Sequence, residues 1–377
     1  MRIQDIHSYP VHDGYRNLLI VQITTDEGLT GVGEAGLSGR ELAVIGAIDH
    51  FRPLLAGQDA TRIEHWWQDL YRGTFFRGGV VIGAALSAID IALWDIQAKA
   101  LGVPLYRLFG GLVRERVRCY CHLQGATPDE LAAEAVRRVA DGYNVLRLHV
   151  PETAPGVLDQ TPAVDEAIAS FAAVRAAVGP AIDICIDVHT RLTPPSARRL
   201  CRAIEREAPY FVEDPLRSDN AASLADLRAH TAVPLAVGEQ FATKWMFREV
   251  IERELTDFAR IDVCLVGGLT EARKIAGWCE THYIELAPHN PLGPVSTAAC
   301  LHLDLASPLV GVQELAREPG VLADVFPRQA PFARGHLLPP EAPGLGVTFD
   351  PQAAEAHPYV RWEVPRLRRS DGSFTDW

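Results

Sequence analysis

The sequence has very little lysine and no pattern of paired cysteines. Of its 36 basic residues, three are lysine (Lys99, Lys244 and Lys274) and the other 33 are arginine. A mechanism that depends on a catalytic lysine therefore has few candidates. The seven cysteines are odd in number and scattered, and they include no CxxC pair. This pattern favours a reduced, cytoplasmic protein over a disulfide framework.

The sequence also lacks long apolar runs and an excess of positive charge. No apolar run reaches the ~18–20 residues that span a bilayer, and the first 15 residues have no apolar core of a signal peptide. The net charge of −12 argues against nucleic acid or an anionic membrane as a partner. With 48% hydrophobic and 22% charged residues, the chain has the composition of a soluble globular protein.

The first 115 residues predict a small α+β unit. Residues 16–24 are apolar and β-branched, TDEG follows as a turn, and residues 29–36 return as a second strand. Helical patterns follow at 41–54, 60–72 and 81–102. The unit therefore begins with an antiparallel hairpin and continues with helices.

From about residue 116 the pattern becomes a repeat of short apolar runs and amphipathic helices. The eight runs are 117–123, 144–150, 183–189, 210–215, 234–239, 258–263, 284–289 and 308–314. Eight such units over roughly 200 residues predict an α/β fold with a closed (β/α)8 barrel. A flat doubly wound sheet is the alternative, but eight regular units favour closure.

Each apolar run ends on or near an ionisable side chain. The series is His122, His149, Asp187 with His189, Glu213, Glu239, Asp262, His289 and Glu314. From Asp187 onward the spacings are 26, 26, 23, 27 and 25 residues, one βα unit each. A helix cap or a solvated loop explains any single member. The recurrence indicates an active site at the carboxyl ends of the barrel strands.

Three carboxylates in this series point to a metal ion. Asp187, Glu213 and Glu239 end three consecutive strands, so they converge and would repel one another without a cation. Oxygen-only ligands suit Mg²⁺. The rival interpretation is a glycosidase, which needs one pair of carboxylates and leaves the third unexplained.

Two histidines accompany the carboxylates. His189 is two residues beyond Asp187, so strand alternation predicts the same face. His289 lies across the barrel, with Asp262 on the preceding strand to orient its ring and raise its basicity. Each histidine alone could be structural; around a metal, the set suggests a general base and a general acid.

One glycine-rich motif has a different interpretation. Gly31, Gly33 and Gly36, with Asp49 further on, superficially resemble a dinucleotide fingerprint. The motif follows a hairpin turn, and no parallel strand follows the next helix at the proper distance. A tightly packed hairpin therefore explains it better than a cofactor site.

Together these motifs resemble the enolase superfamily, in the mandelate-racemase-like branch of acid-sugar dehydratases. The matching stretches run from GVGEAG (31–36) and YRGTFFRGG (71–79) through DVHTRLTPP (187–195), VEDP (212–215) and ARIDVCLVGGLTEARKIA (259–276) to VGVQE (310–314). The resemblance covers nearly the whole chain in order. It implies an α+β capping domain (1–115), a modified, TIM-like (β/α)8 barrel (116–320) and a C-terminal segment (321–377) that packs back on the capping domain.

The resemblance also implies residue roles. Asp187, Glu213 and Glu239 would bind Mg²⁺, and His289 with Asp262 would form the base dyad. His189 would be the acid, and Glu314 would contact the substrate carboxylate. Arg147, His122 and Arg77 are the expected contacts to the rest of an acid sugar. Family members of this kind are usually symmetric assemblies, so a homo-oligomer is expected.

The sugar itself stays open. The barrel residues resemble galactonate dehydratases, whereas EAPGLGV (341–347) and the tail DGSFTDW resemble mannonate dehydratases. The mannonate type uses a tyrosine–arginine pair as base; here Arg147 is present, but residues 150–165 contain no tyrosine. An epimerase, racemase or cycloisomerase on the same scaffold, or a catalytically silent homologue, remains an alternative.

Overall fold

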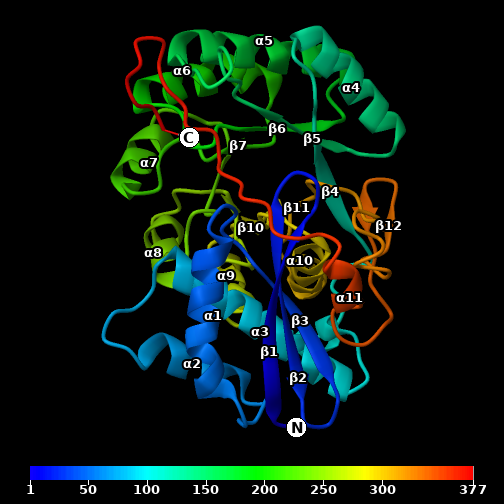
Figure 1. The fold of residues 1–377 in the computed structure, drawn as a ribbon. Coiled ribbons are helices and arrows are strands. Elements are labelled where there is room, and N and C mark those ends of the chain that lie inside the picture. Colours follow the sequence, from blue (N-terminus) through cyan, green and yellow to red (C-terminus); the bar gives the residue numbers. More distant parts are fainter. Residues whose placement is uncertain (377) are drawn as a thin grey trace.

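The computed structural model describes residues 1–376. Its N-terminal part is a three-stranded antiparallel sheet in the order β1-β2-β3, covered by three helices (Figure 1). The strands are β1 (Ile3–His12), β2 (Asn17–Thr25) and β3 (Thr30–Ala35), and the helices are α1 (Glu41–Leu55), α2 (Ile63–Arg72) and α3 (Val80–Ala100). The predicted hairpin is confirmed as β2 and β3, and β1 extends it by a third strand.

The sequence was expected to contain no segment long and apolar enough to span a membrane, and the helix α3 is an exception. By length and mean hydropathy (1.6) it is apolar enough to cross a bilayer. However, 72% of that stretch is buried inside the protein. It packs against β3 and against the barrel helix α9 (Gly268–Thr281), as a core helix of a folded domain does.

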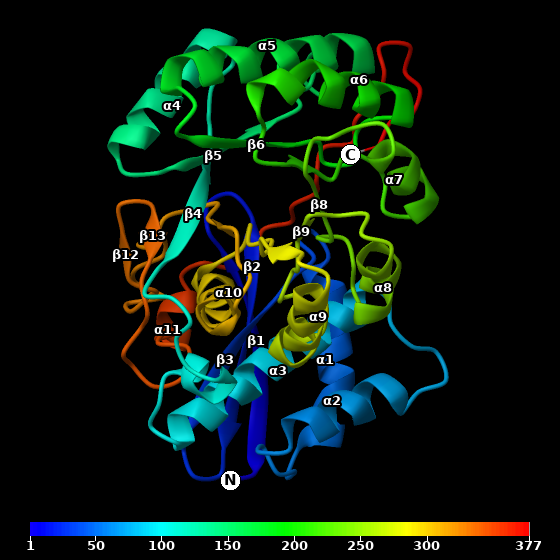
Figure 2. The same cartoon turned by 180° about the vertical axis from the view of Figure 1, so that it is seen from behind.

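The remainder forms the expected barrel, seen from behind in Figure 2. Seven helices connect eight parallel strands in the part of the chain that the structure describes. The strands are β4 (Val117–His122), β5 (Val145–His149), β6 (Asp183–Asp187), β7 (Val212–Glu213), β8 (Leu235–Val237), β9 (Phe258–Ala259), β10 (Glu285–Leu286) and β11 (Gln313–Glu314). Because β11 pairs with β4 and Leu286 bridges to Val310, the sheet closes on itself. The closed barrel is therefore confirmed over the flat sheet.

The elements between and after these strands complete the fold. The barrel helices are α4 (Pro128–Ala140), α5 (Gln160–Val178), α6 (Pro194–Ile204), α7 (Ala221–Arg228), α8 (Lys244–Glu252), α9 and α10 (Pro294–Ala306). The short elements are η1 (Leu105–Phe109), η2 (Glu205–Glu207), β12 (Phe332–Ala333), β13 (His336–Leu337) and α11 (Pro351–Ala354). In the hairpin β12–β13, β13 pairs antiparallel with the first residues of β4, Val117 and Arg118.

Apolar side chains fill the barrel interior below the strand ends. One buried residue comes from each strand or the position beside it: Tyr120, Val145, Cys185, Phe211, Ala236, Phe258, Ala287 and Val312. Since side chains two residues apart in a strand share a face, the next positions toward the carboxyl ends also point inward. This apolar layer packs directly beneath the polar side chains at the carboxyl ends of the strands.

The glycine-rich motif is a packing device. A Cβ on Gly31 would lie 2.2 Å from the carbonyl oxygen of Ala92, and one on Gly33 would lie 1.9 Å from that of Ala88. Both carbonyls belong to α3, so only glycine lets β3 approach this helix so closely. The interpretation as a tightly packed hairpin is confirmed.

Glu34, in the same motif, joins the capping domain to the barrel. Its carboxylate accepts hydrogen bonds from the backbone N–H of Gly293 (2.7 Å) and of Ser296 (2.8 Å), at the N-terminus of α10. The side chain is fully buried. Burial raises the pKa of Glu34 to about 7, and the two N–H groups only partly oppose this shift.

We expect Glu34 to make stability depend on pH. Its pKa is higher in the folded protein than in the unfolded chain, so the folded state holds more protons between about pH 4.5 and 7. The free energy of unfolding should therefore fall as pH rises through this range, by roughly 3 kcal/mol at most. Urea unfolding at pH 5 and pH 8 would measure it. Glu34→Gln should show a smaller fall than the wild type, whereas the exposed control Glu252→Gln should not; equal slopes in all three proteins would contradict the assignment.

The C-terminal segment contacts both parts of the molecule. In the capping domain, the side chain of Asn17 donates a hydrogen bond to the backbone carbonyl of Val360 in the C-terminal segment (2.7 Å). Further on, Leu158 and Arg368 are joined by a backbone hydrogen bond (2.8 Å) on the loop after β5. In Figure 1 this segment runs from α11 toward α7. It therefore spans from the capping sheet to the carboxyl ends of the barrel strands.

Candidate functional site

The polar strand ends form a continuous network in the layer above Tyr120 and its neighbours. The members are His122, Arg147, Asp187, Glu213, Glu239, Arg260, His289 and Glu314. They lie at or just beyond the carboxyl ends of the strands, where barrel enzymes carry their active sites. Most are buried, so this is a concentrated set of charges inside the protein.

The three predicted metal ligands converge. One carboxylate oxygen from each of Asp187, Glu213 and Glu239 lies within 4.8 Å of the others. Burial raises the pKa of Glu213 to about 7, which Arg260 opposes and Asp187 reinforces. Burial and the neighbouring carboxylates raise the pKa of Glu239 well above its usual range. This strain between like charges is the condition that a divalent cation relieves.

The donor atoms fit a hard cation. All three groups offer oxygen, the ligand type of Mg²⁺. Within residues 1–376, no side chain or backbone group forms a hydrogen bond with Oε2 of the buried Glu213. A buried carboxylate oxygen without a donor is costly unless something else binds it. The residues present therefore fit a Mg²⁺ site.

His189 reaches Asp187 by a route that strand alternation does not describe. The strand β6 ends at Asp187, and His189 follows in a left-handed turn with φ of 51°. The turn is held by a hydrogen bond from the backbone N–H of His189 to Oδ1 of Asp187 (2.7 Å). The ring Nε2 lies 2.9 Å from Oδ2 of Asp187 and 3.0 Å from Arg147. The expected proximity holds, but the turn produces it rather than the strand.

Arg147 lies against the same carboxylate. Its guanidinium forms an ion pair with Oδ2 of Asp187 and lies 3.3 Å from Nδ1 of His122. Burial opposes ionisation of Asp187, but Arg147 and His189 hold the pKa of this carboxyl well below its usual range. Burial and Arg147 lower the pKa of His122 to about 4, so this ring is neutral near pH 7.

The second histidine forms a dyad with a carboxylate. Nδ1 of His289 lies 2.9 Å from Oδ2 of Asp262, and Nε2 lies 3.5 Å from Oε2 of Glu239. Burial works against the charged ring, yet Glu239 and Asp262 raise the pKa of His289 to about 9. Asp262 is itself fixed by the backbone N–H of Cys264 (2.8 Å). Near pH 7 the ring therefore carries a proton on Nε2 as long as the charge of Glu239 faces it. Asp262 fixes the orientation of the ring, and a cation bound by Glu239 would offset the attraction that retains this proton and free Nε2 to act as a base.

Glu314 is held from several sides. Its Oε1 lies 2.8 Å from Nε2 of His122, and its Oε2 accepts from Arg260 (2.6 Å) and from the backbone N–H of Asn290 (2.9 Å). Burial opposes ionisation, but Arg260 and His122 hold the pKa of Glu314 well below its usual range. The carboxylate is therefore charged and fixed in orientation.

Arg260 was not among the residues predicted to form the site. This residue is fully buried and pairs with both Glu213 (2.5 Å) and Glu314 (2.6 Å). The signal was present: an arginine stands in the middle of the apolar run 258–263. A fully buried arginine is almost always paired with an acidic group, so this position implied an acidic partner in the barrel interior.

The three lysines serve the packing of other regions. Lys244 and Lys274 bind the buried Glu271 (2.8 and 2.6 Å), and Lys99 binds Asp95 (2.7 Å). Lys244 therefore belongs to α8 and α9 rather than to the polar network. Arg77, a predicted substrate contact, lies exposed in the loop between α2 and α3, and its role stays a prediction.

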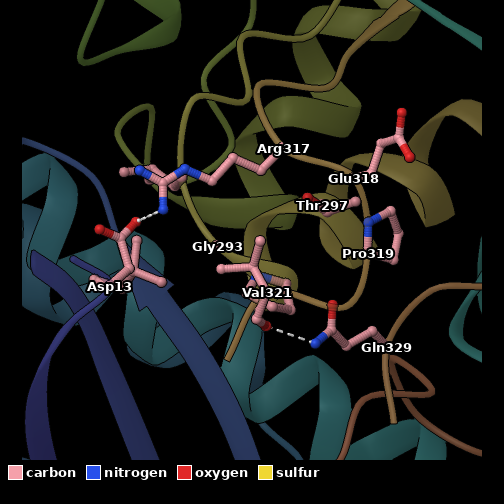
Figure 3. Close-up of a pocket in the computed structure, with 11 residues that line it drawn as sticks. Asp13, Gly293, Thr297, Arg317, Glu318, Pro319, Val321 and Gln329 are labelled. Atoms are coloured by element: carbon pink, nitrogen blue, oxygen red, sulfur yellow. Dashed lines mark hydrogen bonds and ion pairs between the residues drawn. The ribbon is translucent and has the colours of Figure 1, made fainter. Parts of the chain in front are cut away.

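A pocket beside the network lies between the β1–β2 turn of the capping domain and the barrel (Figure 3). Arg317, three residues beyond Glu314, reaches across to Asp13 (2.5 Å) at the turn between β1 and β2. Thr297 also lines the pocket and bonds to the side chain of Asn290, the residue that holds Glu314. The capping domain is thus tied to the loop that follows the last barrel strand.

Comparisons with known proteins agree with this geometry. The family models of the mandelate racemase/muconate lactonizing enzyme N-terminal domain and of the enolase C-terminal domain-like fold match residues 11–110 and 130–353. A D-mannonate dehydratase of Caulobacter sp. (strain K31) is 41% identical, and a D-galactonate dehydratase of Ralstonia nicotianae is 39% identical. The alignments cover 96% and 95% of this chain and 96% of each relative.

A solved structure gives the same result for the fold. The crystal structure of an enolase from Pantoea ananatis with bound D-gluconate and Mg has a TM-score of 0.95 to this chain. The two are 30% identical, and the match covers 100% of both chains. The resemblance stated from the sequence motifs and the capped barrel that it implied are both confirmed.

Proposed function

The chain belongs to the mandelate racemase/muconate lactonizing enzyme family of the enolase superfamily, and from this membership we propose that it is a Mg²⁺-dependent acid-sugar dehydratase. It converts an aldonic acid to a 2-keto-3-deoxy acid. The observation that carries the proposal is the placement of the His289–Asp262 dyad 3.5 Å from a cluster of three carboxylates. The names of the dehydratase relatives and the gluconate and Mg of the Pantoea structure support it.

Asp187, Glu213 and Glu239 would hold the metal ion. When bound, Mg²⁺ supplies positive charge for the substrate carboxylate and for the charge that develops as the C2 proton leaves. Glu314 is fixed by hydrogen bonds with His122 and Arg260. Together with these two neighbours it orients the carboxylate end of the substrate. Arg147, His122 and Arg77 contact the sugar hydroxyls.

The two histidines move the protons. His289 accepts the C2 proton at Nε2, because its Nδ1 is bound to Asp262. His189 donates a proton to the 3-hydroxyl, which leaves as water. The C2–C3 bond becomes double, and the resulting enol tautomerises to the 2-keto-3-deoxy acid.

An epimerase or racemase would exchange protons on both faces of C2 and needs a second base opposite His289. Each of the three lysines contacts a carboxylate outside the polar network, which favours dehydration. A silent homologue would have no use for a buried cluster of like charges. Analysis of the reaction products separates these alternatives.

A screen of sugar acids tests the proposal. Hexonic acids with a free carboxylate and hydroxyls at C2 and C3 should yield 2-keto-3-deoxy acids, detected by a colorimetric keto-acid assay. Their lactones and the corresponding aldoses should give no product, because they lack the carboxylate that the site binds. Turnover of an aldose at a rate comparable to its acid would contradict the proposal.

We also propose the setting in which the enzyme works. All seven cysteines are free and buried, which agrees with a reduced cytoplasmic protein. We propose a homo-oligomer with no nucleic-acid or membrane partner, and three parts: the capping domain (1–115), the barrel (116–320) and the C-terminal segment (321–377). The start of β4 at Val117 supports the first boundary.

A further inference from the structure

Every N–H donor of Arg260 has a fixed acceptor. Nε donates to Oε1 of Glu213 (2.5 Å), and Nη2 donates to Oε2 of Glu314 (2.6 Å) and to the hydroxyl of Tyr120 (2.7 Å). Nη1 donates to the backbone carbonyls of residues 287 and 288, at 2.5 and 3.1 Å. A guanidinium has five N–H groups in a rigid fork, and all five are used here. The group therefore cannot turn without losing several hydrogen bonds inside the protein.

This arrangement divides the two oxygens of Glu213 between different tasks. Oε1 is occupied by Arg260, whereas no hydrogen bond reaches Oε2 from the described residues 1–376. Glu213 therefore offers one oxygen to a cation. Glu314 offers none freely, because His122, Arg260 and Asn290 occupy both of its oxygens.

We propose that Arg260 is a positioning residue that sets the choice of divalent cation, by restricting Glu213 to one oxygen. This inference rests on the metal site of the proposed function. Mg²⁺ takes six ligands in a strict octahedron and keeps several waters, whereas Ca²⁺ takes six to eight oxygens and accepts both oxygens of one carboxylate. Because Arg260 keeps Oε1 of Glu213 from the cation, the site offers fewer oxygen ligands than Ca²⁺ prefers and therefore favours Mg²⁺.

The ratio of the Ca²⁺ and Mg²⁺ dissociation constants tests this inference, measured by titration calorimetry on metal-free protein without substrate. In Arg260→Gln, Oε1 of Glu213 loses the guanidinium and becomes available to a cation. The ratio Kd(Ca²⁺)/Kd(Mg²⁺) should then fall by about tenfold or more, which is the lower end of the effects of residues that hydrogen-bond to metal ligands. The loss of one positive charge strengthens binding of both cations together, so it cancels in the ratio.

The matched control is Arg118→Gln. Arg118 is another barrel arginine, which bonds to the carbonyl of Gly311 (2.7 Å) and to Asp183 (2.8 Å) at the opposite ends of the strands. Its removal changes the charge equally but should leave the ratio as in the wild type. An unchanged ratio in Arg260→Gln would overturn the inference. Failure of the wild type to bind either cation would instead overturn the proposed metal site.

A second measurement applies if Arg260→Gln does not fold, which circular dichroism would show. Crystals of the wild type grown with Mg²⁺ should show Glu213 bound to the ion through Oε2 alone, with Oε1 still on Arg260. Coordination through both oxygens of Glu213 would refute the inference without any variant.

Discussion

Treatment with a chelator is expected to abolish dehydration, and added Mg²⁺ to restore it. Without a cation, the substrate carboxylate would meet Asp187, Glu213 and Glu239, whose oxygens already lie within 4.8 Å of one another. Their raised pKa values let Glu213 and Glu239 take up protons in the metal-free protein, but the site then holds no positive charge for the substrate carboxylate or for the charge that develops as the C2 proton leaves. A keto-acid assay before and after dialysis against chelator measures the effect. Full activity in metal-free protein would exclude the assignment.

Glu213→Gln should reproduce part of this loss. The variant removes one anionic ligand. Loss of a residue that only hydrogen-bonds to a metal ligand typically lowers metal affinity about 10- to 100-fold, so the affinity for Mg²⁺ should fall by more than this. Glu271→Gln is the matched control, since Glu271 is also fully buried but is bound by Lys244 and Lys274 outside the network. Its Mg²⁺ affinity should stay at the wild-type value.

The metal cluster could be predicted from the sequence because of a physical constraint on barrel strands. A buried strand that ends on a carboxylate needs a site at that end, and Asp187, Glu213 and Glu239 recur at the βα repeat. Consecutive strands then pair side by side in the sheet, β6 with β7 and β7 with β8. Regular spacing along the sequence thus converts directly into proximity in space.

The sequence could not show what depends on irregular backbone or on residues far apart in the chain. Strand alternation gave the wrong reason for the position of His189, because β6 ends at Asp187 and a left-handed turn follows. The position of Arg260 within an apolar run implied an acidic partner, but which partners it has appears only when Glu213 and Glu314, on other strands, are in place.

The C-terminal segment shows the same limit at a larger scale. The contact between Asn17 and Val360 joins residues separated by 343 positions, and no local pattern encodes such a pairing. The resemblance to the family supplied the expectation that this segment returns to the capping domain. It did not supply the contact of Arg368 with the loop after β5.

The two histidines can be separated by following hydrogen exchange at C2. His289→Asn should lose both dehydration and exchange of the C2 hydrogen with solvent deuterium, because no group remains to take this proton. Because Nδ1 of His289 is held by Asp262, Nε2 is the ring atom left to accept the proton. Mass spectrometry of substrate recovered from deuterated buffer measures the exchange.

His189→Asn should lose dehydration by roughly 10²–10⁴-fold, the contribution of a positioned acid. It should keep C2 exchange, provided that the His289 ring exchanges its proton with solvent before returning it. Asp262→Asn should resemble His289→Asn more weakly, because the ring loses its orienting carboxylate. The exposed control His230→Asn should retain both activities. Exchange that survives in His289→Asn and disappears in His189→Asn would reverse the two roles, since only the residue that removes the C2 proton is needed for that proton to leave.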